Sequence, residues 1–257
     1  MLIRKVEDRS RLDRDHIAGM VLVIEEKRRR DAQRQFFKLF PDKDTRLPDG
    51  SIIYARAKYA KHLEFFKAGA SYRERCFMAA NRVGKTVGGA YELTCHLTGI
   101  YPDWWEGKRF SRPIRAWAAG KNNETTRDIV QAALLGEVIY EGQRKRVTGA
   151  GMIPGHLFGT LLWKKGSGDL CDTVQVRHVS GGYSTLGFKS YEQGRGSFEG
   201  TARHVIWLDE ECPEDIYGEC LVRTATTGGI VLLTFTPLEG LTKTVLGFMP
   251  QEMRLED

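Results

Sequence analysis

The feature that most constrains this chain is a short loop with a glycine and a lysine, placed between an apolar run and a helical pattern. Residues 79–86 have the sequence AANRVGKT, and the apolar run 76–80 (CFMAA) leads into them. Behind the loop, apolar residues recur at helical spacing as far as residue 97, and Gly99 and Pro102 are stop signals. A buried strand, a tight turn and a helix in this order are typical of a phosphate-binding loop, whose pattern is G-x-x-x-x-G-K-[ST]. Ala79 stands where that pattern has its first glycine.

The residue types kept in the loop are those that phosphate binding requires. Gly84 lets the backbone curl so that successive N–H groups point at phosphate oxygens, and the following helix turns its positive end to the same anions. Lys85 supplies a cation between the β- and γ-phosphates, and the Thr86 hydroxyl is a ligand for Mg²⁺. The alternative is a glycine turn that carries a surface lysine. We expect a nucleotide to contact Ala80, Asn81, Arg82, Val83, Gly84, Lys85 and Thr86.

A second motif, residues 205–210 (VIWLDE), has four apolar residues followed by two carboxylates. A buried strand delivers Asp209 to its carboxyl end, where open α/β sheets bind their ligands. There Asp209 holds Mg²⁺, mostly through water, and Glu210 orients and deprotonates the attacking water. Hydrolysis needs both roles, so the pair predicts an ATPase rather than a passive binder. The alternative is a strand that ends in solvated acids. We expect the next acid, Glu211, to face solvent, and the alternative for it is an acid that supports the site from behind.

A third motif, residues 232–237 (LLTFTP), is an apolar strand that ends in two hydroxyls and a proline. Thr234 and Thr236 at this strand tip are candidates to sense the γ-phosphate and to pass hydrolysis on to a moving part. The alternative is a pair of hydroxyls that cap a strand before a turn.

The rest of the chain alternates strand and helix patterns, which predicts an α/β fold with a mostly parallel central sheet flanked by helices. Residues 1–58 hold 15 basic and 10 acidic side chains, whereas residues 59–257 hold 24 and 23. We therefore divide the chain into a basic helical arm with a linker, residues 1–58, and a P-loop ATPase domain, residues 59–257. Helical patterns cover about 11–40 and 59–69, and further strand candidates are 114–119, 173–179, 184–189, 205–208 and 230–235.

Composition excludes several classes of protein. Of the 257 residues, 41% are hydrophobic and 28% are charged, as in an ordinary soluble globular protein. Apolar runs are shorter than the roughly 18 residues of a membrane helix, and the charged N-terminus lacks the apolar core of a signal peptide. The five cysteines form no C-x-x-C pair, so we expect reduced thiols rather than a disulfide framework or a zinc site. The protein is expected to stay in the cytosol, without a membrane partner.

Longer stretches resemble the large terminase subunit of tailed double-stranded DNA phages, most closely its headful-packaging branch. The resemblance runs from about Tyr59 to Phe248 and implies a DNA-packaging motor. Its N-terminal domain would be a P-loop ATPase of the additional-strand class, and its C-terminal domain an RNase H-type nuclease. Because no later acidic cluster follows before Asp257, we expect the ATPase part alone and no DNA cleavage by this chain. The matching stretches are 74–86 (ERCFMAANRVGKT), 96–102 (HLTGIYP), 207–213 (WLDEECP), 216–219 (IYGE) and 233–238 (LTFTPL).

The resemblance also implies roles for residues outside the three motifs. Tyr59 and His62 fall where the family keeps an aromatic and a glutamine for adenine, so histidine replaces glutamine here. Arg82 is the candidate for an arginine that contacts the γ-phosphate, although Asn81 stands in the expected place.

A ring motor implies an arginine that one subunit donates to its neighbour's site, where it stabilises developing phosphoryl charge. We expect Arg195, on a glycine loop ahead of the second motif, to take this role, with Arg203 as the alternative. The other alternative for Arg195 is a surface arginine. The implied partners are double-stranded DNA, the portal protein, the small terminase subunit and further copies of the chain in a ring, in the host cytoplasm. Residues 28–30 (RRR) are a candidate contact for the portal protein or the small terminase subunit. The basic loop 142–146 (GQRKR) is a candidate contact for the DNA backbone, with a solvated loop as the alternative.

The leading hypothesis is thus ATP hydrolysis with Mg²⁺ that drives duplex DNA through a portal. A helicase-like ATPase, a nucleotide kinase and a non-catalytic, nucleotide-gated assembly module are the alternatives. A kinase needs an acceptor pocket, of which the sequence gives no sign, and Glu210 argues against a non-catalytic module.

Overall fold

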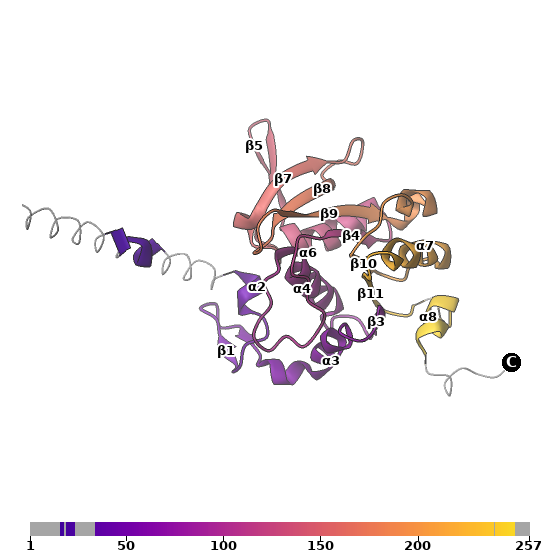
Figure 1. Ribbon diagram of the computed structural model, residues 1–257, viewed down its shortest axis with the longest axis horizontal. Coiled ribbons are helices and arrows are strands. Elements are labelled where there is room, and N and C mark those ends of the chain that lie inside the picture. Colours follow the sequence, from indigo (N-terminus) through magenta and orange to yellow (C-terminus); the bar gives the residue numbers. More distant parts are fainter. Residues whose placement is uncertain (1–15, 18, 24–33, 239, 250–257) are drawn as a thin grey trace, which may run out of the picture.

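A mostly parallel sheet forms the centre of the computed structural model, which describes residues 16–17, 19–23, 34–238 and 240–249 (Figure 1). The sheet has seven strands in the order β3-β11-β10-β4-β9-β8-β7. Its first five strands are parallel, β8 runs antiparallel to β9, and β7 runs antiparallel to β8. The predicted α/β fold is therefore confirmed, and β11 is the additional strand between β3 and β10. The strands are β3 (Glu74–Met78), β11 (Ile230–Phe235), β10 (Val205–Asp209), β4 (Arg115–Gly120), β9 (Tyr183–Ser190), β8 (Cys171–Arg177) and β7 (Phe158–Trp163).

Helices cover both faces of the central strands, which explains their unbroken apolar sequences. Strands β10 and β11 are buried along their whole length. Trp207 of β10 packs in one core cluster with Leu93 of helix α4 (Lys85–Thr98). Ile206, its neighbour in sequence, packs in a second cluster with Cys220 of helix α7 (Glu214–Ala225). Successive residues of a strand point to opposite faces, so each of these strands joins two cores.

The predicted strands all occur, but several of their ends were wrong. The strand expected at 76–80 is β3, which runs from Glu74 to Met78, so Ala79 and Ala80 belong to the loop. The basic segment 142–146 was expected as a loop and is largely strand β6 (Arg144–Val147), which pairs with β5 (Val138–Glu141). Gly142, with φ of 61°, helps to close this hairpin, because a left-handed residue fits the twist of a two-residue turn.

Part of the expected N-terminal arm packs on the domain that contains the central sheet. Most of the helix predicted for 11–40 lies outside the described residues, although 16–17 and 19–23 are helical and α2 (Gln35–Lys38) forms one turn. Phe36 and Phe40 are buried, and both rings contact Tyr91 of helix α4. The division proposed between residues 58 and 59 therefore does not coincide with a break in packing. The helix predicted at 59–69 is present as α3 (Ala60–Ala68).

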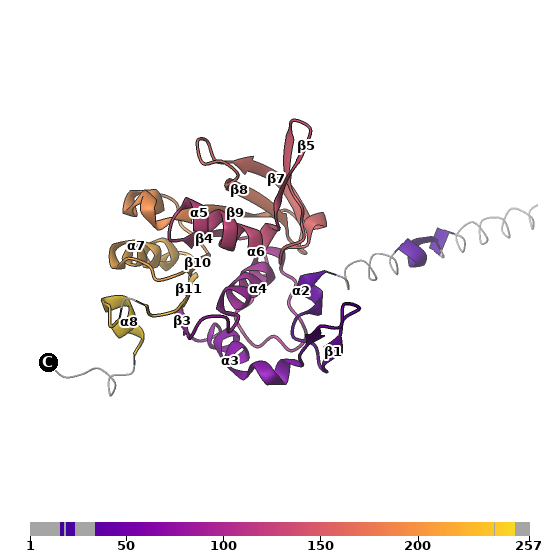
Figure 2. The same ribbon diagram turned by 180° about the vertical axis from the view of Figure 1, so that it is seen from behind.

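The remaining elements connect and flank the sheet (Figure 2). Among the described residues, the structure has no helix that is long and apolar enough to cross a membrane. The five cysteines are free thiols, as predicted. The remaining elements are β1 (Thr45–Arg46), β2 (Ile52–Ile53), the 3-10 turns η1 (Arg56–Tyr59), η3 (Gly155–Leu157), η4 (Tyr191–Gln193) and η5 (Arg195–Phe198), the π-helical η2 (Thr126–Gln131), and the helices α5 (Asn123–Thr125), α6 (Ala132–Leu135) and α8 (Lys243–Phe248).

Candidate nucleotide site

Three neighbouring strands bring the three sequence motifs to one edge of the sheet. The loop 79–84 follows β3, Thr236 follows β11, and Asp209 is the last residue of β10. The strands are in register, because Asp209 pairs with Thr234 and Thr234 in turn pairs with Phe77. The carboxyl edge of a parallel sheet is where α/β proteins bind their ligands. The structure therefore places the expected phosphate-binding loop and the carboxylate of Asp209 side by side.

The closest link between the motifs joins Thr86 to Asp209. The Thr86 hydroxyl lies 3.2 Å from each of the two carboxylate oxygens of Asp209. Asp209 is only 2% exposed, and Thr234 donates its hydroxyl proton to Oδ1 of the same carboxylate over 2.5 Å. The Trp207 indole N–H in turn donates to the Thr234 hydroxyl oxygen at 2.7 Å. The acid is thus held by two hydroxyls, one of which an indole fixes in place.

Burial raises the pKa of Asp209 to about 7, and the negative charge of Glu210 acts in the same direction. The hydroxyls of Thr234 and Thr86 and the charge of Lys85 work against that rise. A buried carboxylate of this kind gains from a nearby cation, because opposite charge favours its ionised form. The oxygen donors of Thr86 and Asp209 are the ligand type that Mg²⁺ prefers. The residues therefore fit a magnesium ion between loop and strand.

Lys85 joins the phosphate loop to the third motif. Its ammonium group donates to the carbonyl oxygens of Ala79 at 3.0 Å and Ala80 at 2.7 Å, and to the Thr236 hydroxyl at 2.8 Å. The Thr236 hydroxyl also lies 2.8 Å from Oδ1 of Asn81. Thr236 therefore touches the loop directly, whereas Thr234 is buried and contacts the acid.

The loop backbone has the left-handed residues that a phosphate cradle needs. Gly84 has φ of 83°, and Arg82 has φ of 63°, which is uncommon for a residue with a side chain. The Arg82 side chain is exposed and has no hydrogen bond or ion pair to the described residues. Asn81, in contrast, is engaged with Thr236. Of the two, Arg82 is the residue with a charged group to offer to a phosphate, and Val83 beside it is exposed at 42%.

His62 contacts the loop from helix α3. Its Nε2 lies 3.3 Å from the carbonyl oxygen of Gly84, and burial lowers the pKa of its imidazole. A Cβ added at Gly84 or at Gly88 would lie 3.3 or 3.2 Å from the same ring. Tyr59 packs edge-on against His62 at 5.6 Å between ring centroids. In this arrangement His62 supports the phosphate loop, and adenine recognition by the pair stays a prediction.

Glu210 has a strained backbone that the sequence did not indicate. Its φ is 69°, and its N–H donates to the carbonyl oxygen of Thr234 at 3.0 Å. The Tyr191 hydroxyl donates to the carbonyl oxygen of Asp209 at 2.8 Å and lies 3.3 Å from that of Glu210. Such strain persists where the surroundings fix the backbone, often at functional sites. Tyr191 was missed because it follows β9, far from every motif in sequence.

Glu211 does not face solvent, and the expectation that it would was wrong. Its Oε1 accepts a hydrogen bond from the Thr242 hydroxyl, and its Oε2 is buried without a partner among the described residues. It lines a cavity of about 550 Å³ with Lys121, Tyr191 and Glu192, beside the carboxyl ends of β4, β9 and β10.

The two arginine candidates lie away from the phosphate loop of their own chain. Arg195 Nη2 and Nε lie 3.1 and 3.2 Å from Oε2 of Glu219 on α7, and its side chain is 57% exposed. Arg203 precedes β10, at the opposite end of that strand from Asp209, and stacks over Trp117 at 4.2 Å. Neither completes the site within one chain, which is compatible with a residue that acts on a neighbour.

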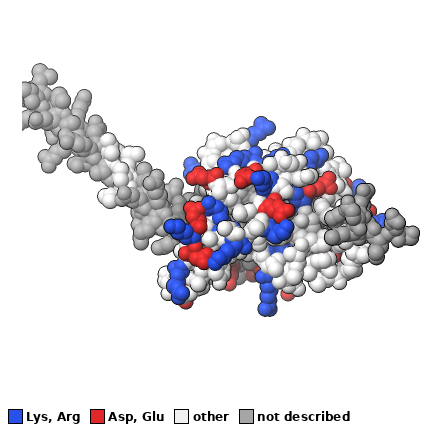
Figure 3. All heavy atoms as spheres, turned by 90° about the horizontal axis from the view of Figure 1, so that it is seen from below, with Lys and Arg blue, Asp and Glu red and all other residues white. Residues whose placement is uncertain are grey.

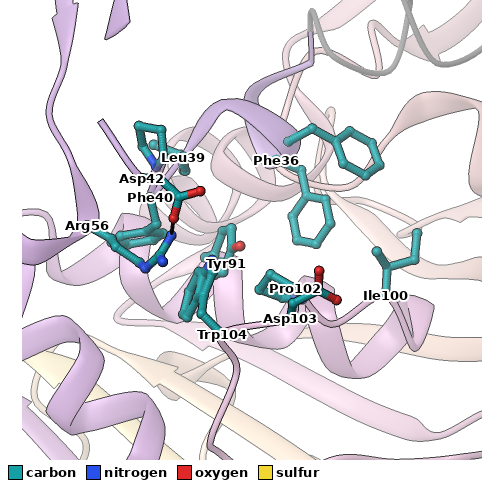
Figure 4. A pocket seen from close by; sticks show the side chains of 12 residues that line it. Phe36, Leu39, Phe40, Asp42, Arg56, Tyr91, Ile100, Pro102, Asp103 and Trp104 are labelled. Atoms are coloured by element: carbon teal, nitrogen blue, oxygen red, sulfur yellow. Dashed lines mark ion pairs between the residues drawn. The ribbon is translucent and has the colours of Figure 1, made fainter. Parts of the chain in front are cut away.

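A separate cavity of about 440 Å³ lies between the N-terminal segment and helix α4 (Figure 4). The rings of Phe36, Tyr91 and Trp104 line it, and an ion pair between Arg56 and Asp42 borders it. Its lining includes no residue of the phosphate loop. We therefore do not assign the nucleotide to this cavity.

The fold and the site define a P-loop NTPase with an additional strand in its sheet. Residues 76–255 match the family model "Terminase large subunit, T4likevirus-type, N-terminal", and the chain belongs to this family. It is 39% identical over 217 residues to the "Terminase, large subunit" of Salmonella phage P22. That match covers 77% of this chain and 42% of the P22 protein, so the chain spans less than half of that relative's length.

Solved structures of the large terminase from a thermophilic bacteriophage are also similar. One crystal form is 14% identical with a TM-score of 0.45, and a second, in complex with ADP, is 12% identical with a TM-score of 0.41. Each match covers 70% of this chain and 38% of the chain from the thermophilic phage.

Proposed function

We propose that this chain is a Mg²⁺-dependent ATPase whose hydrolysis powers the movement of double-stranded viral DNA into a procapsid. The observation that supports this most is the position of Thr86 within 3.2 Å of both Asp209 oxygens, beside a lysine-bearing loop. Membership of the terminase family supports the packaging role. The portal protein, the small terminase subunit and a ring of identical chains, assembled in the host cytoplasm, are the partners that this role requires.

The residues divide the work of phosphoryl transfer. Backbone N–H groups of the loop and the Lys85 ammonium bind the phosphates, and Arg82 reaches the γ-phosphate. Thr86 and Asp209 would hold Mg²⁺, which would neutralise part of the phosphate charge. Glu210 orients the attacking water and accepts its proton. Thr236 contacts Lys85 and Asn81, so it is placed to pass on a change at the phosphates to β11.

Arg195 is our candidate for the arginine donated to a neighbouring subunit. Its side chain is 57% exposed and pairs with Glu219 at 3.1 Å and with Glu199 at 3.9 Å, and at an interface it would exchange these carboxylates for a phosphate. A mixing experiment tests this role: Lys85→Ala and Arg195→Ala chains are each assayed alone and then combined. Recovery of ATPase activity on mixing is expected, since a mixed interface can pair an intact loop with an intact arginine. No recovery, or full activity of Arg195→Ala alone, would remove Arg195 from this role.

Steady-state ATPase activity of Lys85→Ala and Glu210→Ala tests the site itself. We expect both to lose turnover by at least about 100-fold, and only Lys85→Ala to weaken ATP binding as well. Glu214→Ala is the matched control, because this exposed carboxylate lies at the start of α7 and its ion pair in the described part of the chain is with Lys243. Undiminished turnover in both site variants would overturn the assignment. Strand separation by the wild-type protein would instead favour the helicase-like alternative.

A further inference from the structure

The edge of the sheet opposite the phosphate loop carries a band of positive charge. Strands β3, β10 and β4 begin at this edge, and the antiparallel β8 ends there. Basic side chains lie at the ends of these strands or in the segments that lead into them. We call these side chains the amino-edge surface: Arg73, Lys108, Arg112, Arg115, Arg177 and Arg203.

Hydrogen bonds show that the members from different segments are neighbours. Arg73 Nε donates to the carbonyl oxygen of Gly229 at 3.4 Å, and Lys108 Nζ donates to that of the adjacent Gly228 at 2.6 Å. The backbone N–H of Arg115 donates to Nδ1 of His204 at 3.1 Å. The surface therefore continues from β3 across β11 and β10 to β4.

Like charges crowd one another on this surface. Burial lowers the pKa of Arg203 to about 10, and the charge of Arg115 contributes to the shift. Burial also lowers the pKa of His204, and Arg115, Arg112 and Arg203 lower it further. An anion bound here would relieve this repulsion, because opposite charge stabilises the protonated forms.

Negative charge is scarce around this edge. Residues 107–123, 173–191, 200–208 and 220–238 contain no Asp or Glu. Glu74, at the start of β3, is a nearby carboxylate and accepts a hydrogen bond from the Tyr217 hydroxyl at 2.5 Å. By contrast, the face of the molecule in Figure 3 shows positive and negative side chains interspersed.

Three arginines of the surface have unused donors. Arg112, Arg115 and Arg177 are exposed, and their guanidinium groups make no hydrogen bond or ion pair with the part of the chain that the structure describes. Each guanidinium has five N–H donors in a planar fork that fits phosphate oxygens. The surface is thus charged and open, and these three arginines have no acidic partner within residues 34–238 and 240–249.

We propose that the amino-edge surface binds the phosphate backbone of duplex DNA. The inference rests on the proposed packaging function, which requires a grip on DNA of any sequence. Arginine contacts to phosphates supply such sequence-independent binding. An interface this rich in positive charge is also more typical of protein–DNA than of protein–protein contacts.

The size of the surface suits a duplex. From β3 to β8 there are five steps between neighbouring strands, which at about 4.8 Å each span about 24 Å. This length corresponds to about seven base pairs of one strand's phosphates. DNA and nucleotide would then occupy opposite edges of the sheet, joined by the buried strands β10 and β11.

Equilibrium binding of a fluorescent 30-base-pair duplex to the 257-residue chain tests the proposal, measured by anisotropy at several NaCl concentrations without nucleotide. The test variant combines Arg112→Gln, Arg115→Gln and Arg177→Gln. We expect its affinity to fall by at least about tenfold, and the slope of log K against log [NaCl] to become shallower by about 2 to 3. Because these side chains have no hydrogen-bond or ion-pair partner among the described residues, the thermal unfolding midpoint should stay that of the wild type.

The matched control removes the same charge elsewhere through Lys61→Gln, Lys67→Gln and Lys243→Gln, whose side chains are between 68% and 81% exposed. Its affinity for the duplex should stay within about twofold of the wild type. Equal losses in the two triple variants would show a net-charge effect and overturn the proposal. The proposal would also be overturned if the test variant bound the duplex as tightly as the wild type does. Weaker binding of that variant to polyglutamate, a probe for an acidic protein partner, would not rescue the proposal. If the wild-type chain hydrolyses ATP but does not bind the duplex, the DNA-binding surface is disproved and the proposed ATPase site is not. If the Lys85 and Glu210 variants keep full turnover, the proposed ATPase site at the opposite edge of the sheet is disproved.

Discussion

Thr234 donates its hydroxyl proton to the Asp209 carboxylate over 2.5 Å, although the two residues belong to different motifs. The pairing of β11 with β10 places them opposite each other. The sequence suggested that Thr234 senses the γ-phosphate from a strand tip. The structure instead shows Thr234 1% exposed and bound to the acid. Its influence on the site therefore passes through Asp209.

Replacing Thr234 by valine tests this arrangement, because valine keeps the shape of the side chain and removes the donor. We expect kcat for ATP to fall by about 10- to 100-fold, as for other residues that orient a metal-binding group. The dissociation constant for ATP should change much less, since Lys85 and the loop backbone are intact. Thr234→Ser, which keeps the hydroxyl, is the control and should retain most of the activity. Equal losses in the two variants would point to packing instead of the hydrogen bond.

Gly89 gives a second way to disturb the same group of residues. A Cβ at this position would lie 2.4 Å from Nε1 of Trp207, whose indole holds the Thr234 hydroxyl. Gly89→Ala should therefore displace the indole and destabilise the protein by about 1–3 kcal/mol, more than the roughly 1 kcal/mol that alanine gains in a helix. Urea unfolding measures the stability, and the ATPase rate should fall in parallel.

The matched control for this prediction is Gly218→Ala in helix α7, where an added Cβ meets no atom within 4 Å. This change should leave stability equal or raise it by up to about 1 kcal/mol. If Gly89→Ala also raised stability, the close approach of α4 to Trp207 would be disproved.

The phosphate loop and Asp209 were predictable because each is a local pattern. The loop needs residues 79–86 in one turn, and the acid needs only a buried strand before it, so neighbours in sequence carry the signal. Tyr191 lies far from every motif in sequence, and Trp207 acts on the site through Thr234 of another strand. One sequence cannot show which strands and strand ends meet. The left-handed backbone of Glu210 is likewise set by hydrogen bonds to Thr234 and Tyr191.

The sheet was predictable in type but not at its margins. Apolar runs such as 230–235 identify central strands, because helices bury both of their faces. Strand β7 and the hairpin of β5 and β6 lack such runs, since they have exposed residues along their length. The packing of Phe36 on the domain was missed because a charged helical pattern does not reveal which neighbour buries its few aromatic residues.

Buried histidines predict that stability falls at mildly acidic pH. Burial lowers the pKa of His62, His96, His178 and His204 below the ordinary value. The unfolded chain then binds more protons than the folded one, so stability is present above about pH 6.5 and is lost as the pH falls through the folded pKa values. Asp209 acts in the opposite sense, because burial raises its pKa to about 7. In an Asp209→Asn background, which removes this opposing group, we expect the free energy of unfolding to decrease by roughly 1 kcal/mol or more between pH 7.5 and 5.5.

Urea unfolding at the two pH values checks this, and His96→Gln should show a smaller difference between them, because it removes one of the titrating groups. A stability that is constant or higher at pH 5.5 would contradict the assignment of neutral, buried imidazoles.

An ion pair beneath the phosphate loop fixes the strand before the loop to the helix after it. Arg75 of β3 and Glu92 of α4 meet at 2.6 and 3.1 Å, with side chains 4% and 0% exposed. Arg75 also donates to the carbonyl oxygen of Phe65 on α3 at 2.5 Å. Burial raises the pKa of Glu92, but Arg75 and His96 together hold it below its ordinary value. The pair therefore remains ionised inside the protein.

Arg75→Met should lower the free energy of unfolding by about 3–5 kcal/mol, because it leaves a buried carboxylate without its partner. Adding Glu92→Gln should recover part of this loss, since the second change removes the uncompensated charge. Arg144→Met is the control: Arg144 is an exposed arginine of the β5–β6 hairpin and has no partner among the described residues, so its loss should stay within about 0.5 kcal/mol. Denaturant unfolding of the four proteins measures all three differences. An Arg75→Met variant as stable as Arg144→Met, or a double variant weaker than Arg75→Met alone, would show that this pair does not hold β3 to α4.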